Sequence, residues 1–252
     1  MGGIKLITSL NINQNINDKT FEFIQEHLKC ENDIVFLHEV PKDGLKKLEH
    51  NNLQYLEPYY PNTAHFKTVA IVKNKNCFEN MELQPFILSQ KNRIIFLLQS
   101  RTTKKQEIVT DLIIGIHAPA SNHPYQDSSV IPFWTSFIDV MKHIVPYKCL
   151  NFYGINKKIQ DIVIIGDLNV YAPGTERKRF FNRLLSIGMV DLWIEHNNPN
   201  HHYTYENGKN CARLDYALIS DDSWNSYNIN IVDDTRGNNG FTDHSAIIIE
   251  RK

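Results

Sequence analysis

Short apolar runs bounded by polar or turn-forming residues recur along the chain, and longer segments of helical period separate them. The runs are rich in Ile, Val and Leu, as strands buried in a sheet are. Alternation of such runs with helical segments is typical of an α/β domain. The predicted strands are Ile4–Ile12, Asp33–His38, Thr68–Val72, Arg93–Gln99, Ile108–His117, Asp161–Gly166, Leu214–Ile219, Ile229–Val232 and Ser245–Glu250.

The helical segments carry apolar residues three and four positions apart, which places them on one face of a helix. In the first segment Asp18 is the expected N-terminal cap of a helix that ends near Lys29, with Phe21, Ile24 and Leu28 on its buried face. The other predicted helices are Asp43–His50, Ile131–Val145 and Thr175–Ser186. Irregular loops are expected at Ala118–Ser129, Pro199–Cys211 and Asp233–Thr242.

The composition is that of a globular protein of one domain. The chain has 252 residues, of which 42% are hydrophobic and 11% aromatic, so it can bury a sizeable core and is neither disordered nor a coiled coil. No linker or internal repeat divides it, and we expect a single domain over residues 1–252. The formal charge of -1 lacks the basic excess of a non-specific nucleic-acid coat, so a local site must hold any anionic ligand.

Cysteine spacing and apolar length exclude further classes. The cysteines form no C-x-x-C pair, so we expect reduced and mostly structural thiols. The N-terminal apolar stretch is too short for a signal peptide, and no run of about eighteen apolar residues is present to span a membrane. We therefore expect a cytoplasmic monomer without a membrane-spanning segment. The cysteines are Cys30, Cys77, Cys149 and Cys211.

Polar side chains stand at the carboxyl ends of several predicted strands. Asn11 lies late in the first strand, Glu39 follows the second, His117 ends a third, and Asp167 with Asn169 follows a fourth. Each position alone would be an ordinary loop or capping residue. Because strand ends of an α/β sheet converge on a common crevice, carboxylates, amides and an imidazole arriving there together indicate a functional site.

With two further motifs near the C-terminus, the sequence resembles the endonuclease/exonuclease/phosphatase superfamily over nearly its whole length. Each motif alone is at most moderately specific, but the ordered set at these spacings is a strong signal. The motifs that carry the resemblance are Leu10-Asn-Ile-Asn13, Leu37-His-Glu39, Gly166-Asp-Leu-Asn169, Arg213-Leu-Asp215 and Thr242-Asp-His244.

The resemblance implies a four-layer α/β sandwich in which two packed mixed β-sheets are flanked by helices. It also implies a phosphodiesterase that depends on Mg²⁺, or on Mn²⁺, as its cofactor. The stretch from Phe180 to Ser220 is similar to the exonuclease III branch, which favours DNA as the partner and an endonuclease or 3′ exonuclease activity. The alternatives are a phosphatase or sphingomyelinase-like enzyme acting on a small or lipid substrate, and a non-catalytic binding module.

Phosphodiester hydrolysis needs a cation, an activated water and donors for the charge that develops on phosphorus. Glu39 is the first candidate metal ligand, because hard carboxylate oxygens suit Mg²⁺, and Asn11 and Asp243 would assist it. Asp167 is the candidate to orient or deprotonate the attacking water, and Asn169 would steady that water or contact the phosphate.

In the family the final His pairs with the Asp of the Arg-x-Asp motif, so His244 would pair with Asp215 and be held in its charged form. Either His244 or Asp167 could be the general base. His117 resembles a His that assists the leaving group in the deoxyribonuclease branch, but its acidic partner there corresponds to Asn92. We therefore assign His117 to phosphate binding, together with Asn169 and Arg213.

Several other polar or aromatic residues are interpreted as structural. His38 is expected behind the site or in the core, and Trp193 is expected to anchor the core. His201 and His202 are expected at the solvated surface. The basic run Arg177-Lys-Arg179 is more typical of a solvated helix face than of a contact with a nucleic-acid backbone.

Overall fold

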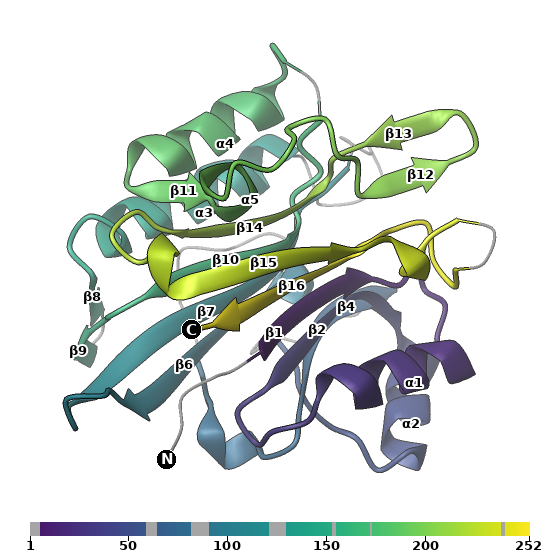
Figure 1. Ribbon diagram of the computed structural model, residues 1–252, viewed down its shortest axis with the longest axis horizontal. Coiled ribbons are helices and arrows are strands. Elements are labelled where there is room, and N and C mark those ends of the chain that lie inside the picture. Colours follow the sequence, from purple (N-terminus) through teal and green to yellow (C-terminus); the bar gives the residue numbers. More distant parts are fainter. Residues whose placement is uncertain are drawn as a thin grey trace.

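The computed structural model describes residues 6–58, 65–81, 91–120, 130–152, 155–171, 173–237 and 240–252. Its strands form two six-stranded sheets and two short hairpins (Figure 1). The first sheet holds β1 (Leu6–Asn11), β2 (Ile34–Pro41), β3 (Gln54–Leu56), β4 (Phe66–Val72), β15 (Tyr227–Val232) and β16 (Ala246–Arg251). The second holds β5 (Glu79–Asn80), β6 (Ile94–Thr102), β7 (Ile108–His117), β10 (Ile162–Asp167), β11 (Met189–Asp191) and β14 (Asp215–Ser220).

The two sheets follow the same plan. The order is β15-β16-β1-β2-β4-β3 in the first and β11-β14-β10-β7-β6-β5 in the second. In each sheet one parallel pair, β1 with β2 or β7 with β10, lies in the middle and antiparallel strands flank it. The carboxyl ends of these four central strands therefore lie at one end of the molecule.

Helices cover the outer face of each sheet. They are α1 (Asp18–His27), α2 (Lys42–His50), α3 (Val130–Ile144), α4 (Glu176–Ser186) and the single turn α5 (Leu192–Glu195). Figure 1 shows α1 and α2 on one side of the paired sheets and α3 and α4 on the other. One apolar cluster lies between the two sheets. A second lies between the first sheet and its helices, and a third lies between the second sheet and its helices. The predicted four-layer sandwich of two mixed sheets is confirmed.

All the predicted strands and helices are present, with bounds that differ by a few residues. The N-terminal cap of α1 is Asn17 rather than Asp18. The Asn17 side chain accepts a hydrogen bond from the backbone N–H of Thr20, and the Thr20 hydroxyl accepts one from the backbone N–H of Asn17. The expected loop Pro199–Cys211 contains a hairpin of β12 (Tyr205–Asn207) and β13 (Asn210–Ala212). Residues 121–129 of the expected loop Ala118–Ser129 lie outside the described residues, as does the start of the first predicted strand.

The prediction of reduced thiols agrees with the structure, whereas the prediction that they are mostly structural does not. All four thiols are free, and none is buried: Cys30 and Cys211 are exposed, and Cys77 and Cys149 are partly exposed. Cys149 opens the short hairpin of β8 (Cys149–Phe152) and β9 (Ile155–Lys158). No helix in the described ranges has the length and apolarity needed to cross a membrane.

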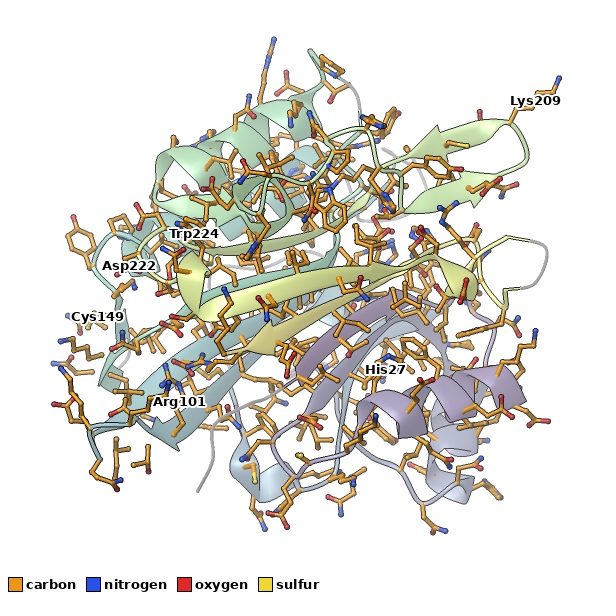
Figure 2. The ribbon with its side chains drawn as sticks, viewed as in Figure 1. His27, Arg101, Cys149, Lys209, Asp222 and Trp224 are labelled. Atoms are coloured by element: carbon orange, nitrogen blue, oxygen red, sulfur yellow. The ribbon has the colours of Figure 1, made fainter. Side chains whose placement is uncertain are left out.

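A buried ion cluster joins the two sheets at the end opposite the β12–β13 hairpin. Figure 2 shows Arg101 of this cluster and Lys209 of the hairpin at opposite ends of the molecule. Arg101 Nε lies 2.6 Å from Asp111 Oδ2, and Arg251 Nη2 lies 2.8 Å from Asp111 Oδ2 and 2.9 Å from Asp161 Oδ2. Since Arg251 is in β16 whereas Asp111 lies within β7 and Asp161 directly precedes β10, the pairs tie one sheet to the other.

Removing one cation from this cluster leaves buried carboxylates without a full partner. We expect Arg251→Gln to lower the free energy of unfolding by about 3 kcal/mol, within the range for a broken buried ion pair. Urea unfolding followed by circular dichroism would measure the change. The matched control is Arg183→Gln, because Arg183 is exposed on α4, and an equal loss there would show that the cluster contributes nothing of its own.

Candidate active site

Side chains from both sheets meet where the central strands end. In the second sheet Asp167 of β10 lies opposite His117 of β7 on one side and Asp215 of β14 on the other. From the first sheet Asn11 of β1 reaches across, and its Nδ2 lies 3.0 Å from Asp167 Oδ2. This hydrogen bond joins the carboxyl end of β1 to the carboxyl end of β10 and thereby holds the two sheets together at the site.

Glu39 reaches the site because β2 departs from regular pairing. The register of β2 with β4 shifts between Leu37 and Val40, and Glu39 has the left-handed φ of 59°. Its Oε1 lies 3.4 Å from Asn11 Nδ2 and 3.3 Å from His117 Nε2. The bulge thus turns Glu39 out of the ladder and toward both sheets.

The turn after β10 fixes Asp167 and Asn169 as a unit. Asp167 Oδ1 accepts from the backbone N–H of Asn169 at 2.9 Å, and Asn169 Nδ2 donates to the carbonyl of Ala118 at 2.8 Å. Burial raises the pKa of Asp167, and the charge of Asp215 raises it further. Asp167 is therefore a buried carboxylate of raised basicity, which suits a group that accepts a proton from water.

His244 is held as a cation by Asp215. His244 Nδ1 lies 2.9 Å from Asp215 Oδ2, which also accepts from the Thr204 hydroxyl at 2.7 Å. Burial lowers the pKa of His244, but the charge and hydrogen bond of Asp215 outweigh burial and raise that pKa to about 10. Its Nε2 stands 3.9 Å from both Asp167 and Asp243, so a charged N–H donor faces the centre of the site.

Arg93 is a site residue that the sequence analysis did not identify. Its Nη1 lies 3.0 Å from His117 Nδ1, and its guanidinium lies over the Phe66 ring at 4.8 Å. Burial lowers the pKa of Arg93 to about 10, while Glu39 and Asp167 act in the opposite direction. Burial and the nearby Arg93 charge also lower the pKa of His117, which is therefore a neutral imidazole. The register of β6 with β7 could have revealed Arg93. Ile94 pairs with Ile116, so Arg93, which precedes Ile94, lies beside His117, which follows Ile116.

The acidic neighbour of His117 is Glu39 rather than residue 92. Asn92 instead donates from Nδ2 to the backbone carbonyl of Phe66 at 2.8 Å. Arg213, expected to bind substrate, has its Nη2 2.7 Å from Asp191 Oδ1, and its guanidinium lies over the Tyr216 ring. The structure brings together all the other predicted site residues, which are Asn11, Glu39, His117, Asp167, Asn169, Asp215, Asp243 and His244.

The site is rich in carboxylates and suits a divalent cation. Ligand atoms of Asp167, Asp215 and His244 lie within 4.8 Å of one another. This trio differs from the predicted ligands, and the bond between His244 and Asp215 already occupies two of its atoms. Glu39 and Asp243 keep side chains that are 20% and 19% exposed, so their oxygens can take a hard cation such as Mg²⁺. Asn11 presents its amide nitrogen to Glu39 and Asp167.

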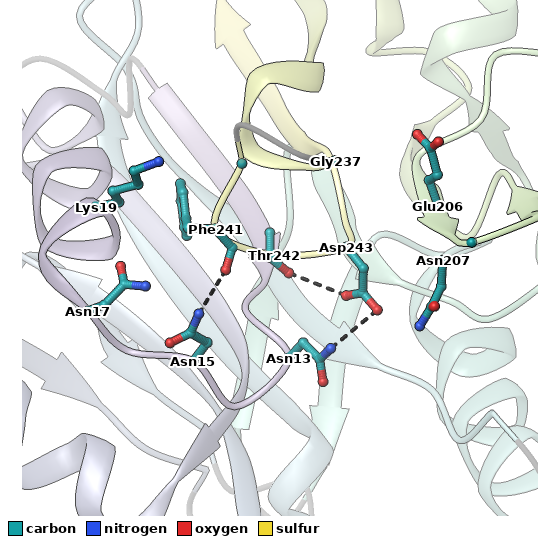
Figure 3. Close-up of a pocket in the computed structure, with 12 residues that line it drawn as sticks. Asn13, Asn15, Asn17, Lys19, Glu206, Asn207, Gly237, Phe241, Thr242 and Asp243 are labelled. Carbon is teal, nitrogen blue, oxygen red and sulfur yellow. Dashed lines mark hydrogen bonds between the residues drawn. The ribbon is translucent and has the colours of Figure 1, made fainter.

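A cavity of about 990 Å³ opens beside Asp243 (Figure 3). Asn13 connects it to the site, because Asn13 Nδ2 donates to Asp243 Oδ2 at 3.2 Å. The lining is dominated by amides and glycines and holds one lysine. The lining residues are Asn13, Asn15, Asn17, Lys19, Glu206, Asn207, Gly208, Gly237, Gly240, Phe241, Thr242 and Asp243.

The residues interpreted as structural are mostly placed as expected. His38 is fully buried, between the hydroxyls of Ser9 and Thr68 at 2.9 and 3.1 Å. Trp193 is buried, and its Nε1 donates to the carbonyl of Pro199. His202 is less free than expected, since it lies against the Trp193 ring and 3.2 Å from Asp233 Oδ2.

Comparisons with solved structures place this fold. No family model matches the chain, and a search of curated proteins finds no relative. The catalytic domain of Xenopus laevis APE2 has a TM-score of 0.71 at 14% identity, over 98% of this chain and 91% of that one. The 3′ phosphatase NExo from Neisseria, bound to a product DNA hairpin, gives 0.69 at 14% identity, over 98% and 99%.

An AP endonuclease from Archaeoglobus fulgidus gives a TM-score of 0.65 at 15% identity, over 98% of this chain and 99% of that chain. At these identities the likeness concerns the fold, and it covers 98% of the chain in each case. The motifs of the sequence and the arrangement of the sheets agree with it. The chain therefore has the fold of the endonuclease/exonuclease/phosphatase superfamily.

Proposed function

We propose that this protein is a Mg²⁺-dependent phosphodiesterase that hydrolyses DNA as an endonuclease or a 3′ exonuclease. The observation that carries the proposal is the arrangement around Asp167, which lies between a neutral imidazole and a charged one at 3.8 and 3.9 Å. A buried base with cationic and neutral donors on either side matches the needs of attack on a phosphoester.

Each residue has a distinct role in the proposed reaction. Asp167 accepts the proton of the attacking water, and Asn169 holds that water or a phosphate oxygen. His244, charged through Asp215, donates to a phosphate oxygen and offsets the charge that develops there. Glu39 and Asp243, with help from Asn11, would hold the metal, which would supply Lewis-acid polarisation of the phosphoryl group.

Arg93 and His117 would receive the phosphate on the side of β7. We expect Arg93→Gln to lower kcat/KM by about 100-fold, the loss for one donor aimed at a developing oxyanion. Initial rates with a fluorescent oligonucleotide would measure it. The control is Arg179→Gln, since Arg179 is exposed and paired with Glu176 on α4. Equal activity of Arg93→Gln and the unchanged protein would show that Arg93 does not bind the reacting phosphate.

A phosphatase acting on terminal phosphates is the second candidate function. A phosphomonoester carries one more negative charge than a phosphodiester. The Arg93 guanidinium is a fixed cation that could bind this additional charge, whereas a metal ion would already be shared with the carboxylates. The 3′ phosphatase NExo shares the fold. A lipid phosphodiester is a further alternative for the same chemistry.

The testing experiment is hydrolysis of a substrate panel with Mg²⁺ and with EDTA. The panel contains a duplex with and without an abasic site, a single strand, a 3′-phosphorylated oligonucleotide, and sphingomyelin vesicles. Metal-dependent cleavage of DNA would support the proposal. Hydrolysis of the terminal phosphate or of the lipid alone would select an alternative, and no turnover of any substrate by folded protein would contradict the proposal.

Metal binding has a prediction of its own. We expect Glu39→Gln to raise the Mg²⁺ concentration for half-maximal activity by about 100-fold, because a charged ligand becomes neutral. Isothermal titration with Mg²⁺ gives a readout that does not depend on turnover. Glu26→Gln on the exposed side of α1 is the control. An unchanged affinity in Glu39→Gln would place the cation elsewhere, first at the group formed by Asp167, Asp215 and His244.

A further inference from the structure

Two exposed tyrosines stand next to the site, and each carries an arginine on its ring. Tyr171 is 58% exposed and comes two residues after Asn169, and the Arg177 guanidinium lies 5.5 Å from its ring centre. Tyr203 is 38% exposed and precedes Thr204, whose hydroxyl donates to Asp215. Neither ring is needed to fill the core, because a large part of each remains in solvent.

The second pair is built more firmly than the first. The guanidinium of Arg236 lies 4.2 Å from the centre of the Tyr203 ring. Arg236 is itself held by Glu206 at 2.7 Å and by the hydroxyl of Ser245 at 2.6 Å. One face of Tyr203 is thus held against a planar cation, and the exposed part of the side chain remains in contact with solvent.

The chain at both tyrosines runs beside β14, because the turn after Asp167 is bonded to the start of that strand through Leu168 N to the Leu214 carbonyl and through the Tyr216 hydroxyl to the Val170 carbonyl. Tyr171 follows the turn that leaves β10, whereas Tyr203 leads through Thr204 toward β14 and the hairpin. Tyr171 is two residues from Asn169 and Tyr203 is next to Thr204, so both rings are close along the chain to residues that build the site.

Among the described residues, the cavity beside Asp243 offers little fixed positive charge for tracking a duplex backbone. It holds one lysine among its amides. In the basic run of α4, Arg179 is paired with Glu176, and Lys178 lies over the Phe181 ring. Arg177 is the member of this run that lies on Tyr171. Recognition of a duplex without base contacts depends mainly on phosphate charge, which this lining supplies poorly.

Aromatic rings recognise bases whose faces are free. In a duplex those faces are covered by neighbouring base pairs, whereas an unpaired base can stack on tyrosine or on a guanidinium plane. We propose that the site takes unpaired nucleotides, with bases next to the reacting phosphate stacked on Tyr171 and Tyr203. This inference rests on the proposed function and adds the substrate class to it.

Binding to an inactive protein tests the inference apart from catalysis. In an Asp167→Asn background, fluorescence anisotropy would compare a labelled single strand with a duplex of the same sequence. We expect the single strand to bind more tightly, and Tyr171→Leu and Tyr203→Leu each to weaken its binding about tenfold. Tyr171→Phe should bind as the parent does. Tyr147→Leu is the control, because Tyr147 is 74% exposed on the turn before β8.

Two arginines of one helix separate stacking from charge. Arg177→Gln should weaken binding of the single strand severalfold, whereas Arg179→Gln should leave it within twofold, although both remove one positive charge. Equal losses in the two variants would mean that charge alone acts there and would overturn the role of the Tyr171 pair.

The outcomes distinguish this inference from the proposed function. Equal or tighter binding of the duplex, or unchanged binding in both leucine variants, would overturn the inference even if the active protein cleaves DNA. Tyrosine-dependent binding of the single strand without hydrolysis of any phosphoester would contradict the proposed function and leave the inference standing.

Discussion

Replacing Asp167 by asparagine is expected to lower kcat/KM for phosphodiester hydrolysis by about 10³-fold, the loss for a group that acts as general base. The substitution keeps the size of the side chain and its acceptor oxygen, so the bond from Asn169 N–H can remain. It removes the negative charge and the ability to accept a proton. Initial rates at saturating Mg²⁺, over a range of substrate concentrations, would show whether kcat carries the loss.

The matched control for this prediction is Asp139→Asn, because Asp139 is exposed on α3 and pairs with Lys142 at 2.7 Å. We expect it to hydrolyse substrate as the unchanged protein does. Circular dichroism should show both variants folded. More than about a tenth of the original kcat in Asp167→Asn would mean that Asp167 orients the water without taking its proton, since catalysis by proton transfer contributes at least about 100-fold.

The central strands of this fold were predictable because they are long and apolar, whereas the four-layer arrangement was predicted from the family resemblance. Runs such as Ile162–Asp167 are buried along their whole length, and no amphipathic helix could produce that pattern. The short strands β3 and β12 could not be predicted in the same way. Each has three residues with exposed or partly exposed side chains, so the neighbouring strand rather than the local sequence decides its conformation.

The candidate site was predictable to the extent that its residues follow strands in sequence. Asn11, His117 and Asp167 needed only the rule that strand ends converge. Arg93 was missed because it reaches His117 through the register of two strands, and nothing local in the sequence states that register. Arg213 shows the converse, since its motif suggested substrate whereas the structure pairs it with Asp191.

The close approach of β7 explains why the motif at the end of β10 begins with glycine, Gly166. Gly166 has a φ of +146°, and a Cβ atom there would lie 1.9 Å from the carbonyl oxygen of Ile116 and 2.9 Å from His38 Nε2. The first contact is with backbone of the adjacent strand, which cannot turn away as a flexible side chain could. The absence of a side chain therefore allows β7 and β10 to approach at the point where His117 and Asp167 leave their strands.

We expect Gly166→Ala to lower the free energy of unfolding by about 4 kcal/mol, the sum of backbone strain and of a forced contact with packed atoms. Chemical denaturation would measure it, and the shifted β10 should lower activity in the protein that remains folded. Gly208→Ala separates the two contributions, because Gly208 also has a positive φ, of +61°, but its Cβ would meet nothing within 4 Å. That variant should lose only about 1 kcal/mol from strain. Equal losses at the two glycines would mean that backbone conformation, rather than the close approach of β7, accounts for the glycine beside Asp167.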